Sequence, residues 1–288
     1  MRKKIAVITG ASSGMGREFV LALDKQQEFD ELWLIARRRD RLESLSAETR
    51  ATVRAIPLDL GERSELDQYK ELLAAECPDV RVLVNAAGFG KFKAFTDLSL
   101  EEQLAMIDLN DKALVAMTYL TLPYMKEGSC IYQLGSLSSF QPVPYINVYG
   151  ASKAFVLSFS RALNKELEKQ NRGIRVMAVC PGWVSTDFFD RAVVDNDTIV
   201  YYNRFYTAEA VIARALKDMK KGKDVSICGL PVRMQVYATK CSPTASSWRS
   251  GANNKRSKRI VPNKTEEHAS GGQEPFLKER FLDLQRTL

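Results

Sequence analysis

Histidine is nearly missing from this chain, because His268 is the only one in 288 residues, and it stands in a polar segment near the C-terminus. This scarcity argues against a histidine-dependent hydrolase and against a His-rich metal site. The five cysteines form no Cys-x-x-Cys pair, and several fall in apolar, strand-like segments. We therefore expect no metal site, and buried thiols in a reducing cytoplasm are the simplest interpretation.

Long apolar runs are also missing. No stretch approaches the roughly 18 apolar residues of a membrane-spanning helix, so no membrane span is expected. No apolar signal region precedes the first strand-like segment, which begins after Lys3. These absences favour a cytoplasmic protein.

The formal net charge of +7 is concentrated in the last segment of the chain. Residues 241–288 hold nine Lys and Arg against five Asp and Glu, so four of the seven charges belong to this polar segment. We expect it to be a disordered or aberrant tail, and the basic balance predicts no nucleic-acid partner. Codons can be chosen for residues 246–255 that, read one base earlier, encode an amphipathic segment. The tail is therefore either a functional tail or a frameshifted terminus.

The remaining 240 residues suit a single α/β domain with one large core. Short apolar, β-branched segments alternate with segments of helical spacing. This alternation predicts a doubly wound parallel sheet of the Rossmann type with helices on both faces. The predicted strands lie near 4–9, 32–36, 53–57, 80–84, 129–134, 174–179 and 225–228, and the predicted helices near 14–26, 39–49, 62–75, 99–126, 149–171 and 207–221.

A glycine-rich segment follows the first predicted strand at once and leads into the first predicted helix. Its residues are Gly10-Ala11-Ser12-Ser13-Gly14-Met15-Gly16. Strand, tight turn and helix in this order place backbone N–H groups and a helix N-terminus where a pyrophosphate can sit. Glycine is needed there because a Cβ would block the turn or the approach of the phosphates.

Tyr149 and Lys153 stand four residues apart in a predicted helix and therefore share one face of it. An ammonium group beside a phenol favours the phenolate and lowers the pKa of the phenol. The pair therefore predicts a tyrosine that works as an acid or base near neutral pH.

These segments resemble a classical short-chain dehydrogenase/reductase over about residues 1–235. Asn110, Ser136, Tyr149 and Lys153 match the catalytic tetrad of that family in order and spacing. Three further segments carry the resemblance: the glycine-rich segment with Thr9, the run Asn85-Ala86-Ala87-Gly88, and the run Pro181-Gly182-Trp183-Val184-Ser185-Thr186. The resemblance implies a hydride transfer between a nicotinamide and a carbonyl or secondary alcohol.

In that reaction the resemblance gives each tetrad residue a role. Tyr149 exchanges the proton with the substrate oxygen, and Ser136 hydrogen-bonds that oxygen. Lys153 lowers the pKa of Tyr149 and contacts the nicotinamide ribose, and Asn110 holds a water that links Lys153 to solvent.

The resemblance also implies a set of cofactor-binding residues. The glycine-rich loop holds the pyrophosphate, Asp59 and Leu60 hold the adenine, and the carbonyl of Asn85 lies near the adenosine ribose. At the nicotinamide end lie Pro181, Gly182, Val184 and Thr186, with Thr186 near the carboxamide.

Charge at the end of the second predicted strand favours NADP(H) over NAD(H). NAD-specific sites usually place an acidic residue there for the ribose hydroxyls. In this chain the strand ends in Arg37-Arg38-Arg39. We expect Arg37 to bind the 2′-phosphate with its planar guanidinium, assisted by the hydroxyls of Ser12 and Ser13. Arg38 and Arg39 can equally be solvated.

The composition of the segments that follow Gly88, Ser136 and Pro181 indicates the chemical class of the substrate. They are rich in apolar and aromatic residues, which favours a hydrophobic ketone or alcohol. The residues are Phe89, Phe92, Leu137, Phe140, Val143, Tyr145, Trp183, Phe188 and Phe189. A non-catalytic NADP(H)-sensing protein remains the alternative, since a fold does not fix a function. Relatives commonly pair the helices at 99–126 and 149–171, so a homodimer or homotetramer is expected.

Overall fold

The computed structural model describes residues 2–26, 28–186, 188, 192 and 205–241. The predicted division of the chain at residue 240 stays a prediction, because the tail from residue 242 onward lies outside the described residues. So does Phe189, one of the residues expected at the substrate pocket.

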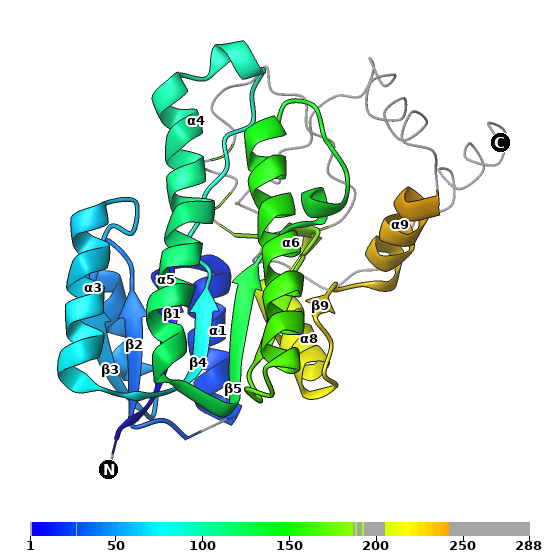
Figure 1. Cartoon of the computed structure of the whole chain (residues 1–288). Helices are drawn as coiled ribbons and strands as arrows, with labels where there is room; N and C mark the ends of the chain where they lie inside the picture. The colour runs from blue at the N-terminus through cyan, green and yellow to red at the C-terminus, as the bar shows by residue number, and fades with distance from the viewer. Residues whose placement is uncertain (1, 27, 187, 189–191, 193–204, 242–288) are drawn as a thin grey trace, which may run out of the picture. The chain divides into compact units, whose positions relative to one another are not determined.

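Seven parallel strands form the central sheet, in the order β3-β2-β1-β4-β5-β6-β9 (Figure 1). This confirms the predicted doubly wound arrangement, with the order reversing between β1 and β4. The strands are β1 (Lys4–Thr9), β2 (Glu31–Ile35), β3 (Thr52–Ile56), β4 (Asp79–Asn85), β5 (Met125–Leu134), β6 (Arg175–Val179) and β9 (Val225–Ser226).

Helices cover both faces of the sheet (Figure 1). Along β1 the side chains alternate: Ala6 and Ile8 pack with one set of helices, and Ile5 and Val7 with the other. The first set comprises α1 (Gly14–Gln26), α2 (Arg39–Glu43) and α8 (Ala208–Lys220), and the second α3 (Arg63–Glu76), α5 (Ala113–Thr121) and α6 (Asn147–Lys169). Because both faces are covered, β1 and β2 carry uninterrupted runs of four buried apolar residues, Ile5–Ile8 and Leu32–Ile35.

The predicted helix at 99–126 is wrong as a single helix. It divides into α4 (Leu100–Ile107), a π-helical turn at Asp108–Lys112 and α5, and the chain is already in β5 at Met125. The predicted capping box is confirmed at the start of α4, where Ser99 and Glu102 satisfy each other's backbone N–H groups. The π-helical turn is the feature that the spacing of apolar residues does not reveal.

Three smaller differences concern helix ends and late elements. The predicted helix at 39–49 ends early, because α2 gives way to a 3-10 turn at Ser44–Ala47. The helix that carries Tyr149 begins two residues before it, at Asn147. A helix not predicted at all, α9 (Leu230–Cys241), follows β9, and the short pair β7 (Trp183–Val184) and β8 (Phe205–Tyr206) forms a second sheet.

None of the helices within the described ranges is long and apolar enough to cross a membrane. Within the same ranges, no group of three or more His, Cys, Asp or Glu side chains is placed to hold a metal ion.

Candidate active site

The glycine-rich loop joins β1 to α1 at the carboxyl edge of the sheet, beside the end of β4. Gly10 and Gly14 have φ values of +65° and +54°, which side chains rarely adopt. A Cβ on Gly16 would stand 2.2 Å from the Gly10 carbonyl oxygen, and one on Gly10 would stand 2.8 Å from the Ala86 backbone. The loop is therefore packed backbone against backbone, and only glycine fits there.

Thr9 ties this loop to the end of β4. Its Oγ1 accepts hydrogen bonds from the backbone N–H groups of Ala86 and Ala87, both at 3.0 Å. Because β1 and β4 flank the point where strand order reverses, this contact fixes the floor of the crevice in which ligands of such sheets bind.

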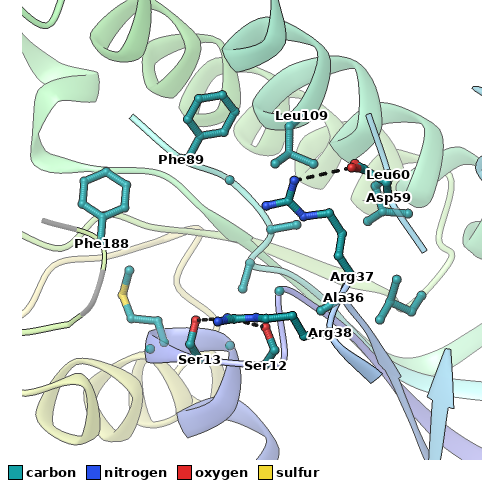
Figure 2. Close-up of a pocket in the computed structure, with 18 of the residues that line it drawn as sticks. Ser12, Ser13, Ala36, Arg37, Arg38, Asp59, Leu60, Phe89, Leu109 and Phe188 are labelled. Atoms are coloured by element: carbon teal, nitrogen blue, oxygen red, sulfur yellow. Dashed lines mark hydrogen bonds and ion pairs between the residues drawn. The ribbon is translucent and has the colours of Figure 1, made fainter. Parts of the chain in front are cut away.

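A cavity opens above this floor (Figure 2). The structure brings together around it ten of the residues expected at the cofactor: Gly10, Ser12, Ser13, Gly14, Met15, Gly16, Arg37, Asp59, Leu60 and Thr186. A helix N-terminus, glycines that leave backbone exposed and two cationic side chains give the cavity the donor set of a dinucleotide phosphate site. The residues present therefore fit the nucleotide.

The two arginines after β2 take different positions (Figure 2). Arg38, not Arg37, reaches the glycine-rich loop: its Nη2 donates to Ser12 Oγ at 3.1 Å and to Ser13 Oγ at 3.5 Å. Arg37 instead lies with its Nη1 3.5 Å from Asp59 Oδ2. Ser12 and Ser13 thus contact Arg38, an arginine that the sequence allows equally to be solvated, and the 2′-phosphate contact of Arg37 stays a prediction. The sequence does not fix the direction in which each arginine side chain points after β2, so it cannot tell which of the two reaches the serines.

Asn85 lies beneath the cavity rather than on its wall. Its side chain is buried, and its Nδ2 donates to Thr118 Oγ1 at 3.1 Å and to Gln133 Oε1 at 2.9 Å. Its Oδ1 is buried without a hydrogen-bond partner within the described ranges. The amide of Asn85 therefore joins β4, β5 and α5 below the cavity.

Asn110 sits on the π-helical turn, fully buried. Its Nδ2 donates to the Phe89 carbonyl and its Oδ1 accepts from the Phe89 N–H, both at 3.0 Å. Its Nδ2 also lies 3.1 Å from Ser152 Oγ on α6. The turn presents this side chain inward, which agrees with the frequent use of π-helical turns at functional sites.

Ser136 and Tyr149 are brought together from separate elements. Ser136 caps a 3-10 turn at Leu137–Phe140, where its Oγ accepts from the Ser138 N–H at 3.2 Å. Tyr149 stands in the first turn of α6, and the Ser136 side chain acts on its hydroxyl to lower the pKa of the phenol.

Lys153 lies one helical turn further along α6 and is only 5% exposed. Its Nζ donates to the Leu134 carbonyl at 2.8 Å and lies 5.7 Å from the centroid of the Tyr149 ring. Burial lowers the pKa of the ammonium to about 8, although the Asp111 carboxylate opposes that change.

The expected lowering of the Tyr149 pKa does not occur in this structure. Burial raises the pKa of the phenol to about 12 and outweighs the opposing hydrogen bond from Ser136. The physical reason is that Lys153 directs its ammonium to a carbonyl oxygen, while the partly buried phenol lies among aromatic rings that solvate its anion poorly.

Aromatic rings close the site on the substrate side. The Tyr149 ring lies 5.7 Å from that of Phe92 and 5.6 Å from that of Phe188, centroid to centroid. Of the nine residues expected at the substrate pocket, Phe92, Val143, Trp183 and Phe188 cluster with Tyr149. Phe89 lines the nucleotide cavity, Leu137 and Phe140 belong to the 3-10 turn, and Tyr145 is 48% exposed.

The segment after β6 runs from the neighbourhood of Ser136 to the glycine-rich loop. The Pro181 carbonyl accepts from the Leu137 N–H at 2.7 Å, beside Ser136. Thr186 lies at the glycine-rich loop, 3.5 Å from where a Cβ on Gly14 would stand. Val184 is buried in the core on β7, and Gly182 faces Val232 of α9. Pro181, Gly182 and Val184 thus lie away from the wall of the nucleotide cavity.

Comparison with known proteins agrees with this arrangement. Residues 4–197 match the family model described as short chain dehydrogenase, and the chain belongs to that family. It is 32% identical over 258 residues to sulfoacetaldehyde reductase 2 of Chromohalobacter salexigens, covering 85% of this chain and 96% of the relative. An uncharacterized oxidoreductase of Staphylococcus epidermidis is 30% identical over 213 residues, which covers 70% of this chain and 91% of the relative.

Solved structures of short-chain dehydrogenases share the fold of this chain. A short-chain dehydrogenase from Sphingobium yanoikuyae in complex with NADPH superposes with a TM-score of 0.72 at 27% identity, covering 88% of this chain and 98% of the other. Serine dehydrogenase complexed with NADP⁺ gives 0.64 at 27% identity, covering 77% and 93%. The protein is therefore an oxidoreductase with the fold and nucleotide-binding architecture of this family.

Proposed function

We propose that the protein is an NADP(H)-dependent oxidoreductase that interconverts a carbonyl and a secondary alcohol on a hydrophobic substrate. The observation that carries this proposal is the convergence of Ser136, Tyr149 and Lys153 beside a cavity built for a dinucleotide. The matching tetrad order and the oxidoreductase relatives support it.

When bound, a nicotinamide cofactor supplies or accepts the hydride. Tyr149 gives its hydroxyl proton to the substrate oxygen during reduction and takes it back during oxidation. Ser136, whose side chain acts on the Tyr149 hydroxyl, holds the same oxygen and stabilises the charge that develops on it. Lys153 contributes positive charge next to the phenol, and Asn110 holds the water that exchanges protons with Lys153.

The preference for NADP(H) rests on charge at the end of β2. Arg38 lies over the hydroxyls of Ser12 and Ser13, where a 2′-phosphate can accept from all three groups. Arg37 adds positive charge nearby, although Asp59 neutralises part of it. Titration with NADPH and with NADH, followed by nucleotide fluorescence, tests this preference. Tighter binding of NADH would contradict it.

The aromatic cluster around Tyr149 supports a hydrophobic substrate. Phe92 and Trp183 pack edge to face, and Phe188 completes a wall over the phenol. Such walls bind flat or bulky apolar carbonyl compounds by excluding water. A panel of aromatic and aliphatic ketones, with sulfoacetaldehyde included because of the relative's name, separates a hydrophobic from a small charged substrate.

The central experiment is Tyr149→Phe, which removes one oxygen atom from the site. We expect turnover to fall by at least about 100-fold, because general acid–base catalysis typically contributes 10² to 10⁴. NADPH binding should stay within a few-fold of wild type. Retained turnover would exclude Tyr149 as the acid. A wild-type protein that binds NADPH and reduces no carbonyl would favour the non-catalytic sensor.

Exposed apolar side chains on three helices support a homodimer or homotetramer. Leu104 and Ile107 of α4, Tyr119 of α5 and Phe155 of α6 are exposed, and Phe155 stacks on Phe159 with ring centroids 5.9 Å apart. Covering such a surface with a second copy removes it from water. Sedimentation of wild type and of Phe155→Glu tests this, since the substituted chain should sediment as a monomer.

The proposed location is the cytoplasm. Cys77, Cys130, Cys180 and Cys228 carry free thiols, the state that a reducing compartment maintains.

A further inference from the structure

A carboxylate next to the catalytic residues takes no part in the reaction proposed above. Asp111 follows Asn110 on the π-helical turn. Its Oδ1 is buried and has no hydrogen-bond partner among the residues that the structure describes. Burial of an ionisable oxygen without a partner costs free energy, so the position of Asp111 calls for an explanation.

The side chains on the same turn are engaged elsewhere. Asn110 uses its amide for the Phe89 backbone and Ser152. Lys112 directs its ammonium to Asp108, with Nζ and Oδ1 3.1 Å apart. The positive charge that acts on Asp111 is instead that of Lys153, across the turn on α6.

Lys153 has no other anion to balance its charge among the groups that act on it. Its hydrogen bond goes to the neutral Leu134 carbonyl. Burial raises the pKa of Tyr149 and of Cys180 to about 12, so both stay protonated near neutral pH. Asp111 has a pKa raised to about 6, also by burial, and is therefore the group beside Lys153 that carries negative charge at pH 7.

The positions of Asn110 and Lys153 show how close this turn lies to the ammonium. A Cβ on Gly88 would stand 2.7 Å from Asn110 Oδ1 and 3.4 Å from Lys153 Nζ. The backbone of Gly88 therefore lies against both groups. Asp111, the next residue, is thus on a turn that packs against the helix of Lys153, and its buried Oδ1 is screened by water less than an exposed carboxylate oxygen would be.

We propose that Asp111 is a positioning residue that acts through Lys153: its partly buried carboxylate is the counter-charge that keeps the catalytic ammonium protonated. The consequence for turnover rests on the proposed function, whereas the charge pairing itself does not. Asp111 touches neither substrate nor cofactor in this assignment. It sets the upper pH limit over which Lys153 can support Tyr149.

The direct test is an NMR titration of Lys153 in the full-length protein labelled with ¹³C-lysine, with the signal assigned by its loss in Lys153→Met. We expect Lys153 to lose its proton near pH 8 in wild type. In Asp111→Asn it should do so about 1 unit lower, the smallest shift typical of losing a nearby opposite charge. Identical titrations in the two proteins would overturn the proposal.

Asp108→Asn is the matched control. Asp108 is a carboxylate on the same turn, but its partner is the exposed Lys112. This substitution should leave the Lys153 titration where it is in wild type, and Asp111→Glu should restore most of the wild-type value. A shift of the Lys153 titration in Asp108→Asn as large as in Asp111→Asn would mean that the turn as a whole, and not Asp111, is responsible.

Activity provides an independent readout. The alkaline limb of the pH profile of kcat/KM should move down with the Lys153 titration in Asp111→Asn, while NADPH affinity at pH 6 stays unchanged. If wild type reduces no carbonyl, the proposed function fails, and the NMR titration still decides the role of Asp111. A moved titration with an unmoved alkaline limb would refute the control of turnover through Lys153.

Stability gives a third measurement with a defined sign. Because the folded-state pKa of Asp111 is raised from 3.8 to about 6, the folded protein binds the proton more tightly than the unfolded chain. Wild type should therefore lose stability relative to Asp111→Asn as pH rises from 4 to 6. Melting temperatures of both proteins across this range test the prediction, and a constant difference would contradict a buried, ionisable Asp111.

Discussion

The site has a nucleotide half, the glycine-rich loop at Gly10–Gly16, and a candidate catalytic half around Ser136, Tyr149 and Lys153. The two halves are held in place by different contacts. Around the glycine-rich loop, backbone packs on backbone, with a Gly16 Cβ position only 2.2 Å from the Gly10 carbonyl. Around Tyr149, side chains pack on side chains: the phenol ring lies against the buried ring of Phe92 and the partly exposed ring of Phe188.

The difference has chemical consequences. Backbone N–H groups at a helix N-terminus bind phosphate whatever the pH, because they do not titrate. In the catalytic half, burial raises the pKa of Tyr149 to about 12 and lowers that of Lys153 to about 8, so the phenol stays neutral and the ammonium loses its proton just above neutral pH. The nucleotide half is thus ready before a ligand arrives, whereas the protonation states of the catalytic half depend on neighbouring charges.

The largest expected effect in this comparison comes from Gly16→Ala. The new Cβ meets backbone atoms that cannot turn away, so the loop must shift. We expect NADPH to bind about 100-fold more weakly, which corresponds to roughly 3 kcal/mol, the upper range for overpacking. Fluorescence titration measures the affinity.

Gly150→Ala is the control for this substitution. A Cβ on Gly150 meets nothing closer than 3.9 Å, and the position is inside α6, where alanine is the better helix former. NADPH affinity should match wild type. Equal losses in Gly16→Ala and Gly150→Ala would show that the loop is not backbone-packed as described.

A smaller effect is expected from Gly90→Ala in the catalytic half. Its Cβ would stand 2.8 Å from Tyr149 Cδ2 and 3.0 Å from Phe188 Cζ, but these are side-chain atoms that can give way. Turnover should fall about 10-fold through misplacement of the phenol, with NADPH affinity unchanged. Stopped-flow kinetics measure turnover and fluorescence titration measures NADPH affinity. A loss confined to NADPH affinity would show that the two halves of the site are not held independently.

Losses of the same size or smaller are expected at the two arginines. Arg38→Met should weaken NADPH binding about 10-fold and leave NADH binding unchanged, because only the 2′-phosphate needs the guanidinium. Arg37→Met should cost less, about 3-fold, since Asp59 already pairs with that side chain. A larger loss of NADPH affinity in Arg37→Met than in Arg38→Met would show that Arg37 binds the 2′-phosphate.

Much of the fold could be predicted, and the misses share a cause. Strand and helix positions follow from apolar periodicity, so the predicted central strands overlap those of the sheet. The prediction of one continuous helix at 99–126 is wrong because the apolar pattern of the sequence does not reveal the π-helical turn at Asp108–Lys112. That turn is set by the contacts of Asn110 with the Phe89 backbone, which are remote in sequence.

The sequence by itself determined the sheet and the glycine-rich loop and supplied the candidate catalytic side chains, because these depend on local periodicity and on residue types at fixed spacings. Tertiary structure decided which arginine meets Ser12 and Ser13, in which direction the pKa values of Tyr149 and Lys153 move, and that Asp111 stands on a turn packed against the helix of Lys153. These outcomes depend on burial and on distances between segments, which are properties of the packed interior and not of any stretch of the chain.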